Sequence, residues 1–224
     1  MPFHGFSEKT IEYLRNLELN NNKQWFESHK KNYEEYLLEP FKNFVSDLGE
    51  FMLSINPNIE IRPAVSKTIS RIYRDTRFSK DKSPYRPKMW ASFKRLADKS
   101  KDYPVFYFGI DTIAYVYGMG YYSAEKSTMD KLRTYIDNNP NDFINEINFY
   151  KKQNIFSLEG EMYKKILDKS KSEEINTWYQ RKNLYFIYEN KIDNTLFSEK
   201  IISDIIKAYK ILTPFYNFLS KLID

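Results

Sequence analysis

The sequence predicts an α+β fold, in which an antiparallel sheet of about four to six strands is flanked by N-terminal and C-terminal helices. Near both ends of the chain, apolar residues recur at three- and four-residue steps, which is typical of amphipathic helices. Between the ends lie short runs rich in β-branched and aromatic residues, as in strands. No repeat, low-complexity linker or break in composition divides the 224 residues, so we expect a single domain, 1-224.

The first 55 residues predict helices. Ser7 is expected to cap the first helix, because a serine oxygen accepts hydrogen bonds from the free N–H groups of the first turn. Asn20-Asn21-Asn22 interrupts the apolar pattern, and Trp25-Phe26 begins a second helical stretch. From Tyr33 to Ile55 the pattern is again helical, and Pro40 should kink or restart that helix because proline lacks an N–H.

The middle of the chain predicts strands. Ile59 to Arg74 contains many β-branched residues and is expected to be extended, as is Met89 to Phe93. Val105 to Ile110 and Ala114 to Met119 form the clearest hairpin pattern, since a short polar turn separates two alternating runs. We place the strand ending near Arg74 in the same sheet as this hairpin.

Helices and one further strand are predicted in the C-terminal half. Ser123 is expected to cap one helix, and Asn139-Pro140 to start the next, because proline is favoured in the first helical turn. A short helix is expected over Ser172–Trp178. Leu184–Tyr188 has the composition of a buried strand, and a long final helix should begin at Ser198.

The residue inventory limits the chemistry. With no cysteine and two histidines, the chain contains no disulfide, thiolate nucleophile or sulfur-ligated zinc, and it cannot form a histidine-rich metal site. We expect no cofactor, and any metal should be a hard ion held by carboxylates, such as magnesium. No run resembles an 18-residue apolar span and the N-terminus lacks signal-peptide features, so we expect a cytoplasmic protein with no membrane partner.

Positive charge is concentrated in one part of the chain. Residues 62–101 contain 13 Lys or Arg and 3 Asp or Glu, a balance of +10, whereas the remainder has 22 against 27, or −5. Such a local excess favours anions, including phosphates, nucleotides and the nucleic-acid backbone.

Within this stretch, the segment 71–86 is the best candidate for a site. Arginine offers paired donors to phosphate or carboxylate, and lysine offers a point charge. Asp75 and Asp81 are weaker candidates, which would orient the arginines, hold magnesium or act as a general base. Tyr73 and Phe78, with Tyr85, offer rings that stack on a base or sugar. The expected ligand-binding residues are Arg71, Arg74, Arg77, Lys80, Lys82, Tyr85 and Arg86.

The run from Arg74 to Tyr85 resembles the family called domain of unknown function 2461. The similarity extends to Gly5-Phe6-Ser7, Leu14, Asn21-Asn22, Trp25-Phe26, Gly118, Gly120, Leu132-Arg133, Trp178 to Lys182 and Thr213 to Tyr216. The resemblance implies a full-length single-domain protein and no catalytic assignment. Arg86 departs from the lysine expected after the tyrosine, which keeps the charge but changes the hydrogen-bond geometry.

Three functional classes remain open. The first is an anion-binding domain for a phosphorylated small molecule or nucleotide, centred on the segment from Arg71 to Arg86. The second is an enzyme that processes phosphoesters or nucleic acid with Asp75 or Asp81. The third is a structural or protein-interaction domain whose arginines pair internally. Tyr179 and Arg181 belong to a second polar cluster, which is either a further part of the site or a solvated connection.

Overall fold

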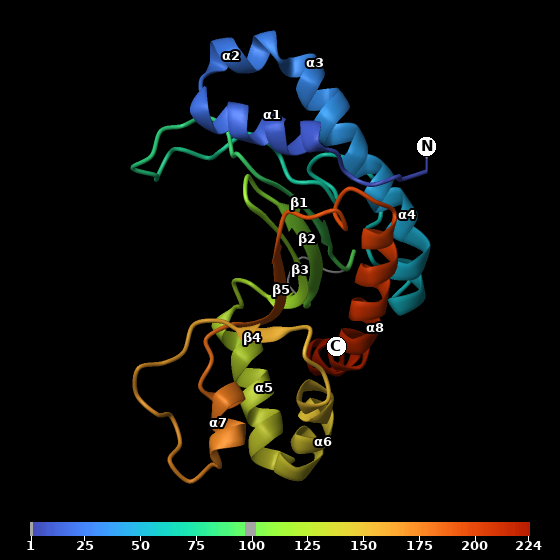
Figure 1. Ribbon diagram of the computed structural model, residues 1–224. Coiled ribbons are helices and arrows are strands. Elements are labelled where there is room, and N and C mark those ends of the chain that lie inside the picture. Colours follow the sequence, from blue (N-terminus) through green and yellow to red (C-terminus); the bar gives the residue numbers. More distant parts are fainter. Residues whose placement is uncertain (1, 97–101) are drawn as a thin grey trace. The chain divides into compact units, whose positions relative to one another are not determined.

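The computed structural model describes residues 2–96 and 102–224, so residues 97–101, at the end of the basic stretch, lie outside the described residues. It confirms the α+β class, with one open antiparallel sheet of five strands in the order β1-β2-β3-β5-β4 (Figure 1). The strands are β1 (Met89–Phe93), β2 (Val105–Ile110), β3 (Ala114–Tyr121), β4 (Ser157–Glu159) and β5 (Leu184–Lys191).

The chain forms two compact units. Unit 1 comprises Met1–Phe93, Tyr107–Tyr117 and Glu189–Ile206, and unit 2 comprises Lys94–Phe106, Gly118–Tyr188 and Lys207–Asp224. Strands β2, β3 and β5 and helix α8 (Lys200–Ile223) each begin in one unit and end in the other. The expectation of a single domain therefore stays a prediction.

Unit 1 begins with the helices that the apolar pattern predicts. They are α1 (Glu8–Leu19), α2 (Lys23–Ser28), α3 (Lys30–Tyr33), the π-helical turn η1 (Glu34–Leu38) and α4 (Glu39–Ile55). Ser7 occupies the N-cap position of α1, as expected, and its backbone carbonyl accepts from the Thr10 amide at 2.9 Å. Asn20 ends α1 with a φ of −121°, not in the left-handed conformation, and the Asn22 side chain caps α2 by accepting from the Trp25 N–H at 3.0 Å.

Pro40 perturbs the helix where the sequence indicates, and η1 ends two residues before it. Because proline lacks an N–H, the carbonyl of Tyr36 loses the helical donor four residues ahead. The buried Thr10 hydroxyl of α1 donates to this carbonyl at 2.7 Å. The carbonyl that Pro40 leaves without its helical donor thus forms a hydrogen bond between η1 and α1.

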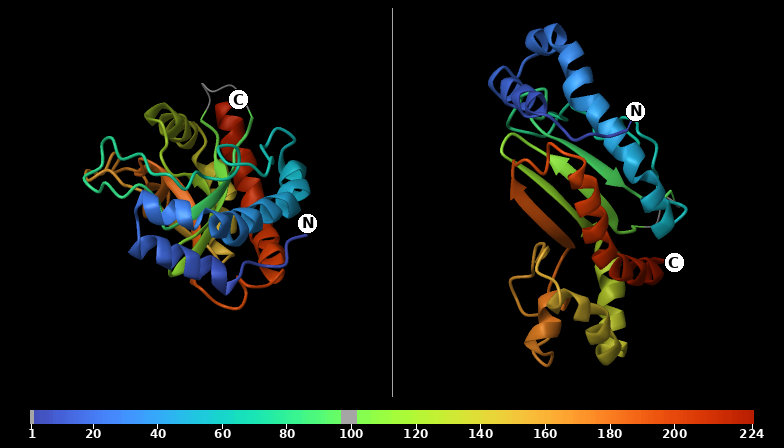
Figure 2. Two further views of the ribbon diagram at one scale, coloured as in Figure 1. Left: turned by 90° about the horizontal axis from the view of Figure 1, so that it is seen from above. Right: turned by 45° about the vertical axis from the view of Figure 1, so that its right-hand side comes forward.

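The core of unit 1 is built on aromatic rings. Phe6 lies 5.1 Å from Phe41, 5.8 Å from Phe44 and 5.6 Å from Phe108, measured between ring centroids. Gly5 precedes it with a φ of +108°, and a Cβ there would lie 2.5 Å from the backbone of Phe197. Only glycine fits this close approach, which explains the sequence Gly5-Phe6. Helix α4 contacts β1 in the same unit (Figure 2).

The prediction of a strand from Ile59 to Arg74 is wrong, since this segment forms isolated bridges and turns. Two amides, of Lys67 and Ile69, donate to the Ala64 carbonyl at 3.1 Å, and Ser66 has a φ of +66°. This tight turn interrupts the extended chain. The segment still lies beside β1, because Ile69 forms an antiparallel bridge with Ala91.

The hairpin of β2 and β3 is confirmed. The Asp111 carboxylate accepts from the amides of Ile113 and Ala114, both at 2.8 Å, and so closes the turn. Gly120 has a φ of +149°, and a Cβ there would lie 2.5 Å from the Leu184 carbonyl oxygen. The predicted close approach of the backbone therefore occurs at Gly120.

Unit 2 contains helices α5 (Lys126–Asn138), α6 (Pro140–Lys151) and α7 (Glu173–Tyr179), with α5 in contact with both of the others. Ser172 caps α7 as predicted, by accepting from the Ile175 amide at 3.3 Å. The prediction that Ser123 caps α5 is wrong. Glu125 is the N-cap, and the Asp102 carboxylate from outside the helix accepts from the Glu125 amide and the Thr128 hydroxyl, both at 3.0 Å.

The core of unit 2 is also aromatic. The Trp178 ring of α7 lies 5.9 Å from Phe143, 6.0 Å from Phe186 and 5.4 Å from Phe215. The final helix, α8, begins close to the predicted start and contains Pro214. Within the described residues, no helix combines the length and apolar character that crossing a membrane requires.

Candidate functional site

The segment from Arg71 to Arg86 forms a loop of unit 1 whose two ends are held together. Tyr73 and Tyr85 form an antiparallel bridge. The Arg74 amide donates to the Pro84 carbonyl at 2.8 Å, and the Arg86 amide donates to the Ile72 carbonyl at 2.9 Å. We call residues 71–86 the basic loop. In Figure 1 it is the teal-to-green loop that extends away from α1.

The side chain of Asn21, just after α1, fixes the base of the basic loop. Its amide oxygen accepts from the Tyr85 N–H and its amide nitrogen donates to the Tyr85 carbonyl, both at 3.0 Å. The amide thus satisfies both backbone groups of Tyr85, as a neighbouring strand would. The Phe26 ring of α2 stacks on the Tyr85 ring at 4.2 Å. Tyr85, predicted to bind ligand, is buried and anchors the loop.

Two arginines of the basic loop pair with the two aspartates. Arg77 donates through Nε and Nη2 to the Asp75 carboxylate at 3.0 and 2.8 Å, which is a bidentate contact. Arg74 forms an ion pair with Asp81. The Arg77–Asp75 pair is exposed, with the Arg77 side chain 78% exposed, and the Arg74–Asp81 pair is about half-exposed. Ion pairs in contact with water contribute little to stability, so both pairs shape the loop more than they stabilise the fold.

The same contacts make the two carboxylates strongly acidic. The Arg77 side-chain and backbone hydrogen bonds lower the pKa of Asp75 to about 2. The hydroxyl and the amide of Ser83 donate to Asp81 at 2.6 and 2.9 Å and, with Arg74, lower its pKa to about 2. A general base works best with a pKa near the working pH, so these aspartates are poor proton acceptors at neutral pH. Across residues 2–96 and 102–224, no group of three or more His, Asp or Glu is placed to hold a metal ion.

The other cations of the basic loop lie along its surface. Lys82 donates to the Thr76 carbonyl at 2.9 Å across the loop, and the Arg86 guanidinium lies 5.1 Å from the centre of the Trp90 ring. Arg71 and Lys80 are exposed and form no ion pair within the described residues.

An aromatic ring stands among these cations. Phe78 is 95% exposed, and the Arg77 guanidinium lies 5.8 Å from its ring centre. Two cavities, of about 460 and 350 Å³, are lined by residues outside the loop. The basic loop is therefore an exposed, anchored surface that presents the Phe78 ring and, to a smaller extent, the Tyr73 ring to solvent.

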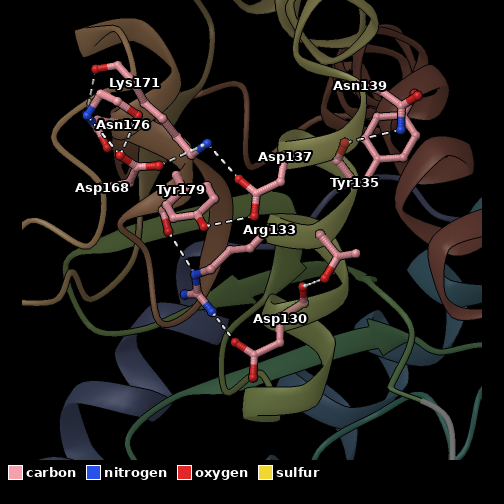
Figure 3. Close-up of polar contacts among 11 residues, drawn as sticks. Asp130, Arg133, Tyr135, Asp137, Asn139, Asp168, Lys171, Asn176 and Tyr179 are labelled. Atoms are coloured by element: carbon pink, nitrogen blue, oxygen red, sulfur yellow. Dashed lines mark hydrogen bonds and ion pairs between the residues drawn. The ribbon is translucent and has the colours of Figure 1, made fainter.

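The second polar cluster lies in unit 2, around Tyr179 (Figure 3). The Tyr179 hydroxyl donates to the Asp137 carboxylate at 3.1 Å, and the Lys171 amine lies 2.6 Å from the same carboxylate. Arg133, which is buried, donates to the Tyr179 carbonyl at 3.0 Å and to Asp130 at 2.7 Å. These side chains already satisfy one another.

Arg181 also points inward. It is buried and donates to three backbone carbonyls, those of Thr177 at 3.0 Å, Gly160 at 3.1 Å and Leu158 at 3.1 Å. Burial lowers the pKa of its guanidinium. The side chain joins β4 to α7 and has little capacity left for a ligand.

Sequence reasoning missed the roles of Asn21 and Arg133. Arg133 carries a usable signal, because it falls on the apolar face of α5 with Met129, Leu132 and Ile136, all buried. A cation at a core position predicts a buried arginine that bonds to backbone carbonyls. Asn21 carries no comparable signal, since its partner Tyr85 is 64 residues away.

A family model described as conserved hypothetical protein, DUF2461, matches residues 9–218. No curated protein matches the sequence. The match covers the basic loop, both of its anchors and the second cluster. The chain therefore belongs to the DUF2461 family of conserved hypothetical proteins.

Proposed function

We propose that the protein binds phosphate groups through the basic loop, and that these phosphates belong to an extended polyanion, a single-stranded nucleic acid. One observation carries the proposal: exposed cations and the 95% exposed ring of Phe78 share one loop whose base is anchored. Proteins that bind single strands combine a positive surface along the backbone with aromatic rings on which bases stack.

The charge balance of the loop supports this function. Residues 71–86 contain six Lys or Arg and two Asp, so a balance of +4 remains after both aspartates are paired. Because the pairs hold Arg74 and Arg77 in place, the chain pays less entropy to present the remaining donors. Exposed cations that follow a surface are suited to a chain of phosphates.

The exposure of the loop and the pairing of its aspartates argue against the two alternatives, a site for a small phosphorylated molecule and a phosphoester hydrolase. A small phosphorylated molecule or a free nucleotide is usually enclosed by a concave pocket that covers most of its surface, whereas the cations here face solvent. Phosphoester hydrolysis through Asp75 or Asp81 would need a carboxylate that accepts a proton or holds a metal. Both carboxylates are occupied by arginine or serine donors.

The experiment is a titration of a fluorescent single-stranded oligonucleotide with the full-length protein at several salt concentrations. We expect the logarithm of the affinity to fall linearly with the logarithm of salt, with a slope of about −0.7 per phosphate contacted. Lys80→Gln and Arg71→Gln should each remove a contact and flatten this slope. Phe78→Ala should weaken binding by about 1 to 3 kcal/mol, because it removes a stacking surface.

Lys182→Gln provides the matched control, since Lys182 is an exposed lysine of unit 2 outside the loop. It should keep wild-type affinity and slope. Melting temperatures of the loop variants should stay close to wild type, because the altered side chains are exposed. Binding of inorganic phosphate or ATP with no binding of the oligonucleotide would instead support a site for a small phosphorylated molecule. Loss of fold stability in Arg77→Ala, together with no ligand binding, would support a purely structural loop.

A further inference from the structure

One cavity in unit 1 is lined by residues outside the basic loop. It has a volume of about 460 Å³ and is lined mainly by α1, by α2 and by the residues just after α2. That volume falls in the range of small-molecule sites, which is roughly 300 to 1,000 Å³. Asn20 and Trp25 line it, and their sequence neighbours Asn21 and Phe26 hold the base of the basic loop. Cavity and loop thus belong to the same helical corner of unit 1.

One wall of the cavity is a stacked aromatic pair. The rings of Trp25 and His29 lie 4.2 Å apart and are inclined by 13°. His29 Nδ1 lies 2.9 Å from the Trp25 carbonyl oxygen. A carbonyl only accepts, so Nδ1 donates this hydrogen bond. The bond fixes the orientation of the His29 ring, and the pair offers a flat aromatic surface.

Tyr13 contributes a hydroxyl that lacks a partner. The residue is 4% exposed, and its hydroxyl is buried with no hydrogen bond to any described residue. Buried polar atoms in folded proteins nearly always have a partner. Burial raises the pKa of this phenol, and the neighbouring Tyr33 raises it further. The hydroxyl therefore stays protonated and can both donate and accept. The Tyr13 side chain is also part of the cavity lining.

The rest of the lining is polar without net charge. Asn16 and Asn32 line the cavity, and their side-chain amides form no hydrogen bond within the described part of the chain. Lys9 and Glu12 contribute one positive and one negative charge. This balance distinguishes the cavity from the basic loop and favours an uncharged ligand.

We propose that this cavity is a binding site for an uncharged nucleobase. A base offers a flat face for the Trp25–His29 wall and an edge of donors and acceptors for the Tyr13 hydroxyl and the asparagine amides. Stacking on aromatic rings combined with hydrogen bonds to the base edge is how proteins recognise unpaired bases. Asparagine amides match the paired donor and acceptor of adenine in particular. The base is carried either by a free nucleoside or by an unpaired position of a strand.

The test is calorimetric titration of the full-length protein with adenosine, guanosine, cytidine and uridine, which carry no phosphate. Adenosine should bind. Tyr13→Phe should raise its dissociation constant by about tenfold, because the change removes only one hydrogen-bonding group. Tyr216→Phe makes the same change in a buried tyrosine of unit 2 that does not line the cavity, and it should leave the constant unchanged.

Asn32→Ala is a second variant, on the less buried side of the cavity, and it should also weaken binding. Circular dichroism checks that each variant folds. The proposal is overturned if no nucleoside binds, if Tyr13→Phe and Asn32→Ala both bind as wild type, or if methyl riboside without a base binds equally well. It is also overturned if the cavity instead takes a zwitterionic amino acid through Lys9 and Glu12.

The source of the base follows from the oligonucleotide titration. If a base of the strand enters the cavity, Tyr13→Phe weakens oligonucleotide and nucleoside binding together. If free nucleosides are the ligand, Tyr13→Phe weakens nucleoside binding alone. Lys80→Gln should leave nucleoside binding unchanged in either case, so failure of the basic-loop proposal and failure of the cavity proposal give different results.

Discussion

Arginine has two structural roles in this protein: a buried arginine binds backbone carbonyls, and an exposed arginine pairs with a carboxylate. Arg181 is buried and donates to the carbonyls of Leu158, Gly160 and Thr177. Arg77 is exposed and forms a bidentate contact with Asp75. A buried acceptor that loses its donor cannot turn to water, whereas an exposed carboxylate can. The two side chains therefore differ strongly in what their removal costs.

We predict that Arg181→Met lowers the free energy of unfolding by about 2 to 3 kcal/mol. The Leu158 carbonyl loses its donor in a buried contact, and the Gly160 and Thr177 carbonyls lose theirs in partly buried contacts. An unsatisfied buried group costs about 1 to 3 kcal/mol, and a partly exposed one costs less because water reaches it. Lys182→Met is the matched control, because Lys182 is exposed and pairs with Glu161 at 3.3 Å on the surface; it should change the value by less than about 1 kcal/mol. Urea denaturation measures both. Equal stability of the two variants would mean that Arg181 is not a structural link.

At the same scale, the sequence indicated pairing of the loop arginines with Asp75 and Asp81 as one of several alternatives, but not which residues pair or which way the side chains face. The alternation of Arg74, Asp75, Arg77 and Asp81 indicated a polar network, and the pairs are present. Tyr85 looked like a stacking residue because it lies among cations, yet it is buried under Phe26. Its direction depends on Asn21, a contact across 64 residues that no local pattern reports.

At the scale of elements, Pro40 interrupts the long N-terminal helical segment, and a contact from α1 compensates for the interruption. Pro40 removes the N–H that the Tyr36 carbonyl would otherwise accept, and the Thr10 hydroxyl replaces it from α1 at 2.7 Å. A π-helical turn, η1, occupies the same position. The interruption is therefore also a contact between α1 and η1, and the contribution of this contact to the stability of the fold depends on both Thr10 and Pro40.

We predict that Thr10→Val lowers the free energy of unfolding by about 1 to 3 kcal/mol, because valine keeps the shape but leaves the Tyr36 carbonyl without a donor. In a Pro40→Ala background the restored N–H can take this role, so the same substitution should cost clearly less. The double-mutant cycle measures the difference as a coupling energy of about 1 kcal/mol. Additive effects of the two substitutions would contradict the conclusion that the Thr10 hydroxyl replaces the N–H missing at Pro40.

Elements with a strong local period were predicted well, and elements fixed by distant partners were not. The alternation in β2 and β3 and the aspartate in their turn were sufficient to identify the hairpin. In the segment from Ile59 to Arg74 the β-branched residues indicated a strand, but the segment forms a tight turn and isolated bridges, because composition alone does not ensure pairing. The start of α5 was misplaced because Asp102, rather than Ser123, supplies the acceptor. β4 is short and its partner lies nearly thirty residues ahead.

At the scale of the whole molecule, the two compact units share elements. Helix α8 runs from Lys200 in unit 1 to Ile223 in unit 2, and β2, β3 and β5 likewise continue from one unit into the other. A helix or strand loses cooperativity when part of it melts, because each residue is stabilised by its neighbours in the same element. Shared elements should therefore transmit unfolding from one unit to the other.

We predict a single cooperative unfolding transition. Trp25 and Trp90 lie in unit 1 and Trp178 lies in unit 2, so a Trp178→Phe variant reports on unit 1, and a variant with Trp25→Phe and Trp90→Phe reports on unit 2. Within each variant, tryptophan fluorescence and far-ultraviolet circular dichroism should give the same midpoint in urea, which is the test of two-state behaviour.

Adding Phe44→Leu, a core substitution confined to unit 1, makes the test sharper. It should lower the free energy of unfolding by about 1 to 2 kcal/mol, and by the same amount in both reporter variants, because the unit that is not altered must unfold with the one that is. Two separate midpoints, or a shift seen only by Trp25 and Trp90, would show that the units unfold independently and that the chain contains two domains in the thermodynamic sense.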